Sequence, residues 1–252
     1  MAARHLESNT WLVACLLATF ACGFPIERAS ERRHATATAL PSGADIQRDE
    51  RTGTIRFLRA ANLSAGLERD PDFRDLQSKD AFADVAVRFL DAYRSLFGLQ
   101  QPAEELVVRS VAEDDLGMKH VRLQQVFARL PVWGAEILVH LDKANHVSLV
   151  QGRYVRTPSQ VQTRPRLDRD AAVRIVGEAL RGKGATCRNC ESELVIALTP
   201  EGRPRLAYRV VTKPSLIEGW ALMIDAETGA IIEKVSTVVS GGVVSPPRPA
   251  GP

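Results

Sequence analysis

The sequence lacks long hydrophobic runs, a strong excess of either charge and the short motifs of the common catalytic sites. The apolar stretch at residues 11–20 is too short to cross a bilayer, which needs about 20 apolar residues. The 33 basic and 30 acidic residues leave a formal net charge of +3. Nucleic-acid-binding domains usually carry a basic stripe, so we expect neither a nucleic-acid partner nor a transmembrane segment.

Catalytic motifs are missing as well. A zinc hydrolase with the HExxH motif needs two histidines one helical turn apart and a glutamate base between them. The sequence holds five histidines, none of them in this motif: His5, His34, His120, His140 and His146. Ser64 and Ser148 lack the elbow or paired base of a nucleophilic serine, and no phosphate-binding glycine loop occurs. We therefore expect no enzyme activity, no catalytic residue, no metal site and no cofactor.

Residues 1–23 have the pattern of a secretory signal peptide: a polar start, an apolar centre and the small residues Ala21-Cys22-Gly23. Cleavage before Cys22 is an alternative, in which Cys22 carries a lipid as in bacterial lipoproteins. Thr19 and Phe20 fit that alternative poorly, because a leucine usually stands three residues before the cysteine. We expect a secreted, periplasmic or cell-surface protein, with the lipid anchor left open.

The first half of the chain predicts one helix and a series of strands. Residues 24–53 have no periodicity and are expected to be a flexible lead, and residues 66–79 to be a loop. Apolar residues at steps of three and four predict a helix over 80–97, begun by Ser78 or Asp80 and ended by Gly98. Short connections indicate antiparallel pairing of the expected strands, which are 54–60, 105–112, 119–129, 132–142 and 146–155.

The second half repeats this order after a proline-containing linker at 157–167. A helix is expected from Asp168 to Gly182, followed by strands at 192–198, 205–211, 219–225 and 230–238 and a disordered tail at 240–252. Residues 84–89 match 170–175 at an offset of 86, and 105–108 match 193–196 at an offset of 88. Two α+β units are predicted, each a helix packed on a twisted antiparallel sheet.

Cys187 and Cys190 form a C-x-x-C pair that follows the second helix and precedes a strand. A redox pair of this spacing normally stands at a helix N-terminus, and a zinc site needs two further ligands. A structural disulfide is favoured, with a redox pair, a metal site or free thiols as alternatives.

Residues 117–154 resemble the propeptide module shared by fungalysin and thermolysin. The likeness is carried by Gln124 or Gln125, Pro131, Val132, Trp133, Gly134, Val147 and Gly152. The second half resembles the PepSY module that follows it in such precursors. Here the likeness is carried by residues 193–196, by Tyr208 and its neighbours, and by the segment from Trp220 through Asp225 and Thr228 to Gly229.

These motif residues are interpreted as structural rather than catalytic. Pro131 is expected to shape a turn at Leu130-Pro131, and Gly134 to permit a bulge early in a strand. The segment from Asp225 to Gly229 is typical of a hairpin connection, because Asp bonds the backbone and Gly adopts positive φ.

The resemblance implies two tandem cystatin-like units, a propeptide module at 54–156 and a PepSY-like module at 168–239. It also implies an inhibitor or folding chaperone of a thermolysin-like zinc peptidase. No catalytic domain follows in this sequence, so action in trans is expected. Two alternatives are a truncated peptidase precursor and a cell-surface binding module with no peptidase partner.

Overall fold

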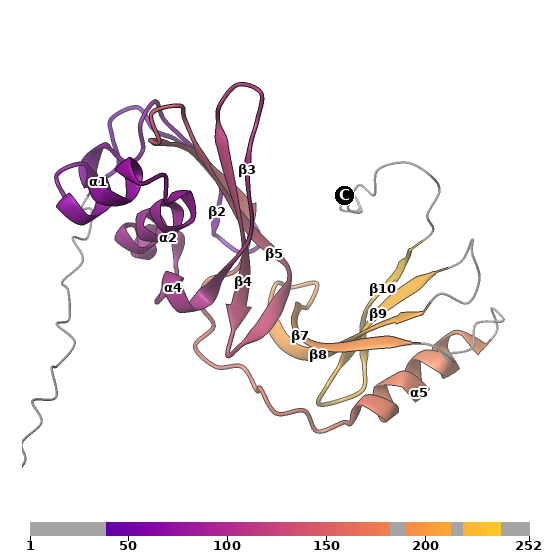
Figure 1. Ribbon diagram of the computed structural model, residues 1–252. Helices are drawn as coiled ribbons and strands as arrows, with labels where there is room; N and C mark the ends of the chain where they lie inside the picture. Colours follow the sequence, from indigo (N-terminus) through magenta and orange to yellow (C-terminus); the bar gives the residue numbers. More distant parts are fainter. Residues whose placement is uncertain (1–38, 182–189, 213–218, 238–252) are drawn as a thin grey trace, which may run out of the picture. The chain divides into compact units, whose positions relative to one another are not determined.

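The computed structural model describes residues 39–181, 190–212 and 219–237 and shows an α+β fold (Figure 1). The expected signal peptide with Cys22, much of the expected lead, Gly182, Cys187 and the tail lie outside the described residues. In the part that the structure describes, no helix has the length and apolarity needed to cross a membrane.

The first half builds an antiparallel sheet in the order β1-β2-β6-β5-β4-β3. Its strands are β1 (Asp45–Arg48), β2 (Ile55–Arg59), β3 (Leu106–Glu113), β4 (Lys119–Phe127), β5 (Leu130–Leu141) and β6 (Val147–Arg153). Alternation of apolar and polar residues gives β4 and β5 one buried face, with Val121, Leu123, Ile137 and Val139 fully buried.

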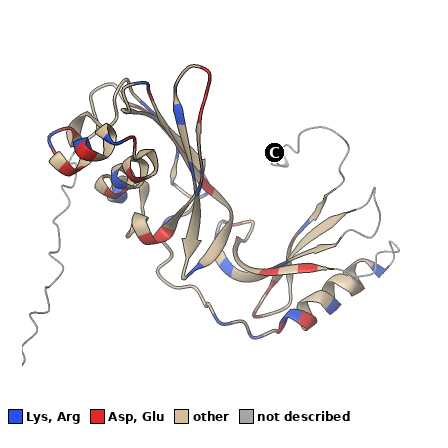
Figure 2. Ribbon diagram, viewed as in Figure 1, with Lys and Arg blue, Asp and Glu red and all other residues tan. Residues whose placement is uncertain are grey.

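Short helices cover that buried face (Figure 1). They are η1 (Ala65–Leu67), α1 (Pro71–Ser78), α2 (Phe82–Ala92), α3 (Arg94–Phe97) and α4 (Pro102–Glu105). The apolar stripe of α2 buries Val85, Phe89 and Leu90 in the core. In Figure 2, α1 and α2 carry several acidic (red) and basic (blue) residues, whereas the strands are mostly tan, the colour of all other residues.

Three expectations for this half need correction. The expected loop at 66–79 contains α1, which Asp70 caps by accepting a hydrogen bond from the N–H of Asp72 (3.0 Å). The expected helix over 80–97 divides at Tyr93, and Asp80 stands outside it with φ 54°. Strand β1 lies within the expected flexible lead, because pairing with β2 orders it. Gly98 ends α3 with φ 72°, as predicted.

The turn between β4 and β5 is also displaced from its predicted position. It is formed by Ala128 and Arg129, whose φ values of 49° and 66° suit the tight turns that match strand twist. Pro131 lies inside β5 and pairs with Val126 instead of shaping the turn. The pattern misled because neither turn residue is a glycine or asparagine, the usual signals for positive φ.

The second half consists of α5 (Arg169–Ala179) and an antiparallel meander of β7 (Glu191–Leu198), β8 (Pro204–Thr212), β9 (Trp220–Asp225) and β10 (Ile231–Ser236). Asp168 caps α5, as predicted, by accepting from the N–H of Ala171 (2.7 Å). Ala172 and Val176 of α5 are fully buried in the main core. A parallel bridge between Val132 on β5 and Ile196 on β7 joins the two sheets.

Candidate functional site

The start of β5 places Trp133 on the surface. Its neighbour Val132 is completely buried and bridges to Ile196, while the Trp133 side chain points the other way and is 41% exposed. The guanidinium carbon of Arg209 on β8 lies 4.1 Å from the centre of the indole ring. A cation over an aromatic face at this distance is an attractive contact. Trp133 is thus partly exposed to solvent and also contacts the second sheet through Arg209.

A groove of about 490 Å³ opens beside this contact, and we call it the Trp133 groove. Its apolar floor is the face of the second sheet opposite α5, where Ala197 and Met223 are almost fully buried. Its rim is basic. The lining residues include Trp133, Gly134, Ala197, Ala221, Met223 and Ile232, with Arg51, Arg153 and Arg209 around them.

Arg209 is held in two ways at the rim. One guanidinium nitrogen donates to a carboxylate oxygen of Glu193 (2.8 Å) while the plane lies against Trp133. Its Nε atom is buried and has no hydrogen-bond partner among the described residues. A buried N–H without a partner carries a desolvation cost that an acceptor on a bound molecule would relieve.

Two adjacent glutamines at the end of β4 bond to backbone groups, and Gln124 does so on both sides of Trp133. The Gln124 amide donates to the carbonyl oxygens of Val132 and Ala135, each at 2.8 Å. Gln125 is 1% exposed and makes a two-way pair with the backbone of Val155, accepting from its N–H (3.0 Å) and donating to its carbonyl (2.8 Å). The Gln124 bonds satisfy the β5 carbonyls on both sides of Trp133, where the β4–β5 register shifts, and the Gln125 bonds fix the segment that follows β6.

Two glycines of the motif have different physical roles. Gly134 has φ 68°, and a Cβ atom there would meet no described atom within 4 Å. Gly152 lies opposite Ile137, and a Cβ atom there would collide with the Glu136 carbonyl oxygen. Gly134 is therefore required by backbone conformation, and Gly152 by close approach of two strands.

The motif residues of the second half make contacts within that half and with the end of the linker. The Tyr208 hydroxyl donates to the Leu167 carbonyl (3.1 Å). One carboxylate oxygen of Asp225 accepts from the N–H groups of Glu227 (2.8 Å) and Thr228 (2.9 Å). Gly229 completes the connection with φ 79°, and Lys234 lies 5.0 Å from the ring centre of Trp220.

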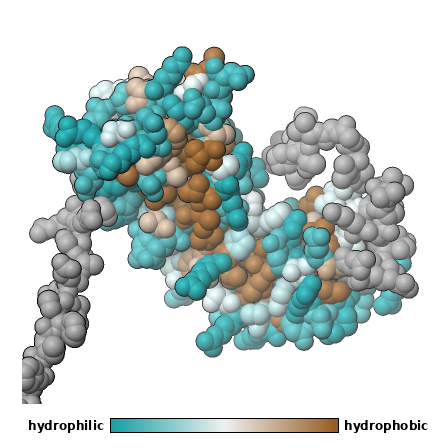
Figure 3. Space-filling view, viewed as in Figure 1, coloured by the Kyte–Doolittle hydropathy of each residue, from teal (hydrophilic) through white to brown (hydrophobic). Residues whose placement is uncertain are grey.

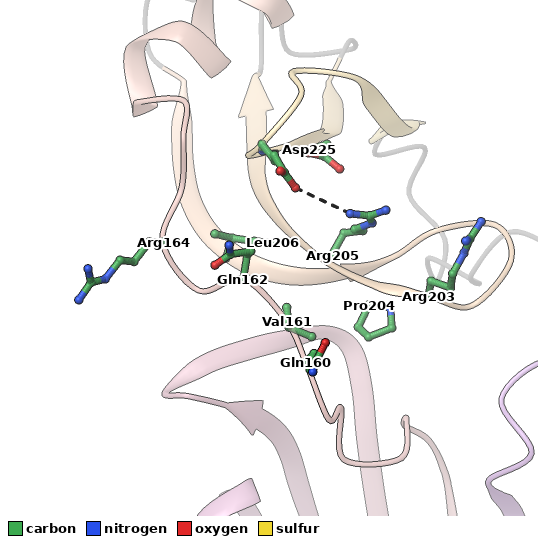
Figure 4. Close-up of a pocket in the computed structure, with 10 residues that line it drawn as sticks. Gln160, Val161, Gln162, Arg164, Arg203, Pro204, Arg205, Leu206 and Asp225 are labelled. Carbon is green, nitrogen blue, oxygen red and sulfur yellow. Dashed lines mark hydrogen bonds and ion pairs between the residues drawn. The ribbon is translucent and has the colours of Figure 1, made fainter.

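A second, larger hollow of about 620 Å³ lies where the linker passes the start of β8 (Figure 4). Gln160, Val161 and Arg164 line it from the linker. The dashed line in Figure 4 is the ion pair between Arg205 and Glu227, 3.9 Å apart. Both side chains are more than a third exposed, and exposed ion pairs contribute little, so the chemistry here is that of a solvated surface.

The structure brings together two histidines that sequence reasoning did not pair. Nδ1 of His140 on β5 lies 2.6 Å from Nδ1 of His120 on β4. Asp114 contacts the far nitrogen of His120 (3.0 Å), and Gln151 that of His140 (3.2 Å). Burial lowers the pKa of His140, and the neighbouring His120 lowers it further.

His146 lies elsewhere, between Asp142 (3.2 Å) and Glu68 (3.6 Å). Within residues 39–181, 190–212 and 219–237, no group of three or more His, Cys, Asp or Glu is placed to hold a metal ion. Cys190 is disulfide-bonded, and its predicted partner Cys187 lies outside the described residues.

Comparison with known proteins finds a family resemblance in the segment that contains Trp133. Residues 104–154, which include β3 to β6 and Trp133, match the family model described as the Fungalysin/Thermolysin Propeptide Motif. The predicted resemblance to the propeptide region of thermolysin-type peptidases is thereby confirmed.

Particular relatives are similar to the chain over a longer stretch. Bacillolysin of Bacillus amyloliquefaciens is 30% identical over 146 residues, which cover 54% of this chain and 28% of bacillolysin. Thermolysin of Alicyclobacillus acidocaldarius subsp. acidocaldarius is 26% identical over 170 residues, covering 63% of this chain and 31% of thermolysin. The chain therefore spans less than a third of the length of these relatives.

Among solved structures, the C-terminal domain of Bacillus megaterium YpeB is similar with a TM-score of 0.36 and 14% identity, covering 77% of this chain and 75% of that domain. A putative lipoprotein from Clostridium difficile 630 has a TM-score of 0.23 and 12% identity, with 53% and 84% covered.

Proposed function

We propose that this protein is a non-enzymatic, propeptide-like partner of a thermolysin-like metallopeptidase, acting in trans as an inhibitor, a folding chaperone or both. The observation that carries the proposal is the family match over 104–154, the segment that also presents Trp133. Its relatives, bacillolysin and thermolysin, give the kind of partner. The missing HExxH motif is the reason to assign a binding role and not a catalytic one.

The Trp133 groove is the proposed contact surface. An apolar floor buries apolar side chains of a partner, and the arginines at its rim attract acidic ones. Trp and Arg are the residue types that most often dominate binding energy at interfaces. The groove therefore suits an extended peptidase segment that carries apolar side chains and at least one carboxylate.

The modular plan belongs to the same proposal. The propeptide module would span 54–156, the linker 157–167 and the PepSY-like module 168–239, as two tandem cystatin-like units. The repeated order of helix and antiparallel strands supports this plan, as do the matching offsets in sequence.

Location follows from the N-terminal pattern. A signal peptide at 1–23 would export the protein to the medium, the periplasm or the cell surface, where the peptidase acts. A lipid on Cys22 would instead hold it at the membrane surface.

The direct test is a titration of purified residues 24–252 against a thermolysin-like peptidase from the source organism, measuring both inhibition and the yield of refolded peptidase. Inhibition at micromolar concentration or a raised yield is expected. A chain supplied in trans lacks the high effective concentration of a tethered propeptide, so it should bind less tightly than a covalent one.

The matched variants are Trp133→Ala and, as a control, Leu116→Ala at the exposed β3–β4 turn. Trp133→Ala should weaken inhibition about tenfold or more, as loss of an interface anchor does, while Leu116→Ala should not. No inhibition and no gain in yield with any such enzyme would reject the proposal and favour a binding module without a peptidase partner.

A further inference from the structure

Strand β3 is an exposed edge of the first sheet. It pairs with β4 on one side, and no described strand pairs with its other side. Seven of its eight residues are exposed, including Val107 (43%), Val108 (39%) and Val111 (45%). In Figure 3 brown side chains form a strip over the region where Figure 1 labels β3 and β4. A long edge with exposed β-branched residues is a template for pairing with another strand.

The exposed valines lie mainly on the face that the helices cover elsewhere. Val108 pairs with the buried Leu123, and Val111 pairs with the buried Val121. Both valines therefore point to the face of the sheet that carries the helices, but at positions that the helices leave exposed. The register shift between Val108 and Ser110 makes Arg109 the extra residue of a bulge. Strict alternation from there places Arg109, Val111 and Glu113 on one face.

Arg109 and Glu113 are the two charged residues of β3. Both are exposed, and neither has an ion-pair partner within the described part of the chain. In an antiparallel pair of two β3 strands centred on Val111, each Arg109 stands opposite the other copy's Glu113, and Val111 stands opposite itself. If the pair were centred on Arg109, the two copies of Arg109 would face each other as like charges. If it were centred on Ser110, Glu113 of one copy would face Val107 of the other. Opposite charges facing across strands stabilise a pairing, and like charges destabilise it.

We propose that a second copy of this chain pairs with β3, antiparallel and centred on Val111, to form a symmetric dimer. The strand-to-strand hydrogen bonds supply affinity, and the two Arg109–Glu113 contacts select the register. The pairing also covers the exposed valines of both copies. It does not depend on peptidase binding, because β3 takes no part in lining the Trp133 groove.

The test is analytical ultracentrifugation of residues 24–252 over a hundredfold range of concentration. Concentration-dependent dimers are expected. Arg109→Glu alone and Glu113→Arg alone should each weaken dimerisation about tenfold or more, since each sets like charges in opposition. The double variant Arg109→Glu with Glu113→Arg should restore it. Arg56→Glu, a charge reversal at an exposed position of β2, is the control and should leave dimerisation unchanged.

If the double variant restores dimerisation, the single variants lost it through charge repulsion between the strands and not through misfolding. Two unrelated folding defects would add and would not cancel. A chain that stays monomeric over the whole range overturns the proposal. So does a dimer that the single reversals leave intact, or one that the double variant fails to restore.

Discussion

The guanidinium of Arg209 on β8 lies against the indole of Trp133 on β5, 4.1 Å from the ring centre, and so links the two sheets by a side-chain contact. The same junction contains the bridge between Val132 and Ile196. The buried neighbour Val132 fixes the backbone at Trp133, and Arg209, which Glu193 orients, packs on the indole ring. An exposed tryptophan held in this way loses little side-chain freedom on binding, which favours its use as an anchor.

The first prediction concerns that contact. A double-mutant cycle of Trp133→Ala and Arg209→Ala should give a coupling of about 0.5–1 kcal/mol in the free energy of unfolding, the range for a partly exposed cation–π pair. Urea unfolding of the four proteins measures it. Simple additivity of the two single effects would show that the contact contributes nothing.

Gly152 and Gly134 should respond differently to alanine. At Gly152 the new methyl group collides with the backbone of Glu136, so we expect a loss of about 3 kcal/mol or more, at the upper end for overpacking. Gly134→Ala meets open space and suffers only from its positive φ, which costs about 1 kcal/mol. Chemical denaturation of both variants makes the comparison, and equal losses would contradict it.

Gln125→Leu should destabilise the fold by about 2–4 kcal/mol. The leucine leaves the N–H and the carbonyl of Val155 buried without their partners, and each unpaired group costs about 1–3 kcal/mol. Gln124→Leu, at a position that is less buried, is the comparison. A loss under 1 kcal/mol for Gln125→Leu would mean that water replaces the glutamine.

Stability should fall as the pH drops below the ordinary histidine range. The folded pKa of His140 is lowered from 6.5, so between the two values the unfolded chain binds more protons than the folded one. The contribution of His140 to the free energy of unfolding therefore decreases as pH falls through 6.5 and levels off below its folded pKa. Of the neighbouring side chains, His120 lowers the pKa of His140 and Asp114 raises it.

The variant His140→Gln should flatten this pH dependence, measured by urea unfolding at pH 7.5 and pH 5. Ser148→Ala removes a hydroxyl that donates to the His140 carbonyl and carries no titrating group, so it should keep the wild-type slope. Identical slopes for wild type and His140→Gln would assign the pH dependence to other groups.

The predicted Cys187–Cys190 disulfide should survive in exported protein. Mass spectrometry of non-reduced peptides is expected to find the two residues linked, in agreement with the bonded state of Cys190. The enclosed loop is very short, so replacing both by alanine should change stability only modestly. Two free thiols, or Cys190 linked to another cysteine, would disprove the pairing.

Local chemistry made much of the fold predictable. The cap at Asp168, the left-handed ending at Gly98 and the connection from Asp225 to Gly229 rest on contacts within a few residues, so a short stretch of sequence contains the whole cause. The α+β class and the meanders followed from periodicity for the same reason. Even so, the β4–β5 turn was misplaced, since Ala128 and Arg129 adopt positive φ without the residues that signal it.

The tertiary structure alone decided where side chains from different strands converge. His120 meets His140 because the β4–β5 register sets them opposite each other, and a shift of one residue would turn one of them to the other face. Arg209 reaches Trp133 only because β5 and β7 join, a contact between distant segments that no local pattern encodes. By itself the sequence determined most of the elements, although not β1 or α1, and the resemblance to a propeptide, because these rest on neighbouring residues. The groove depends on strand register and sheet pairing, which only the folded chain sets.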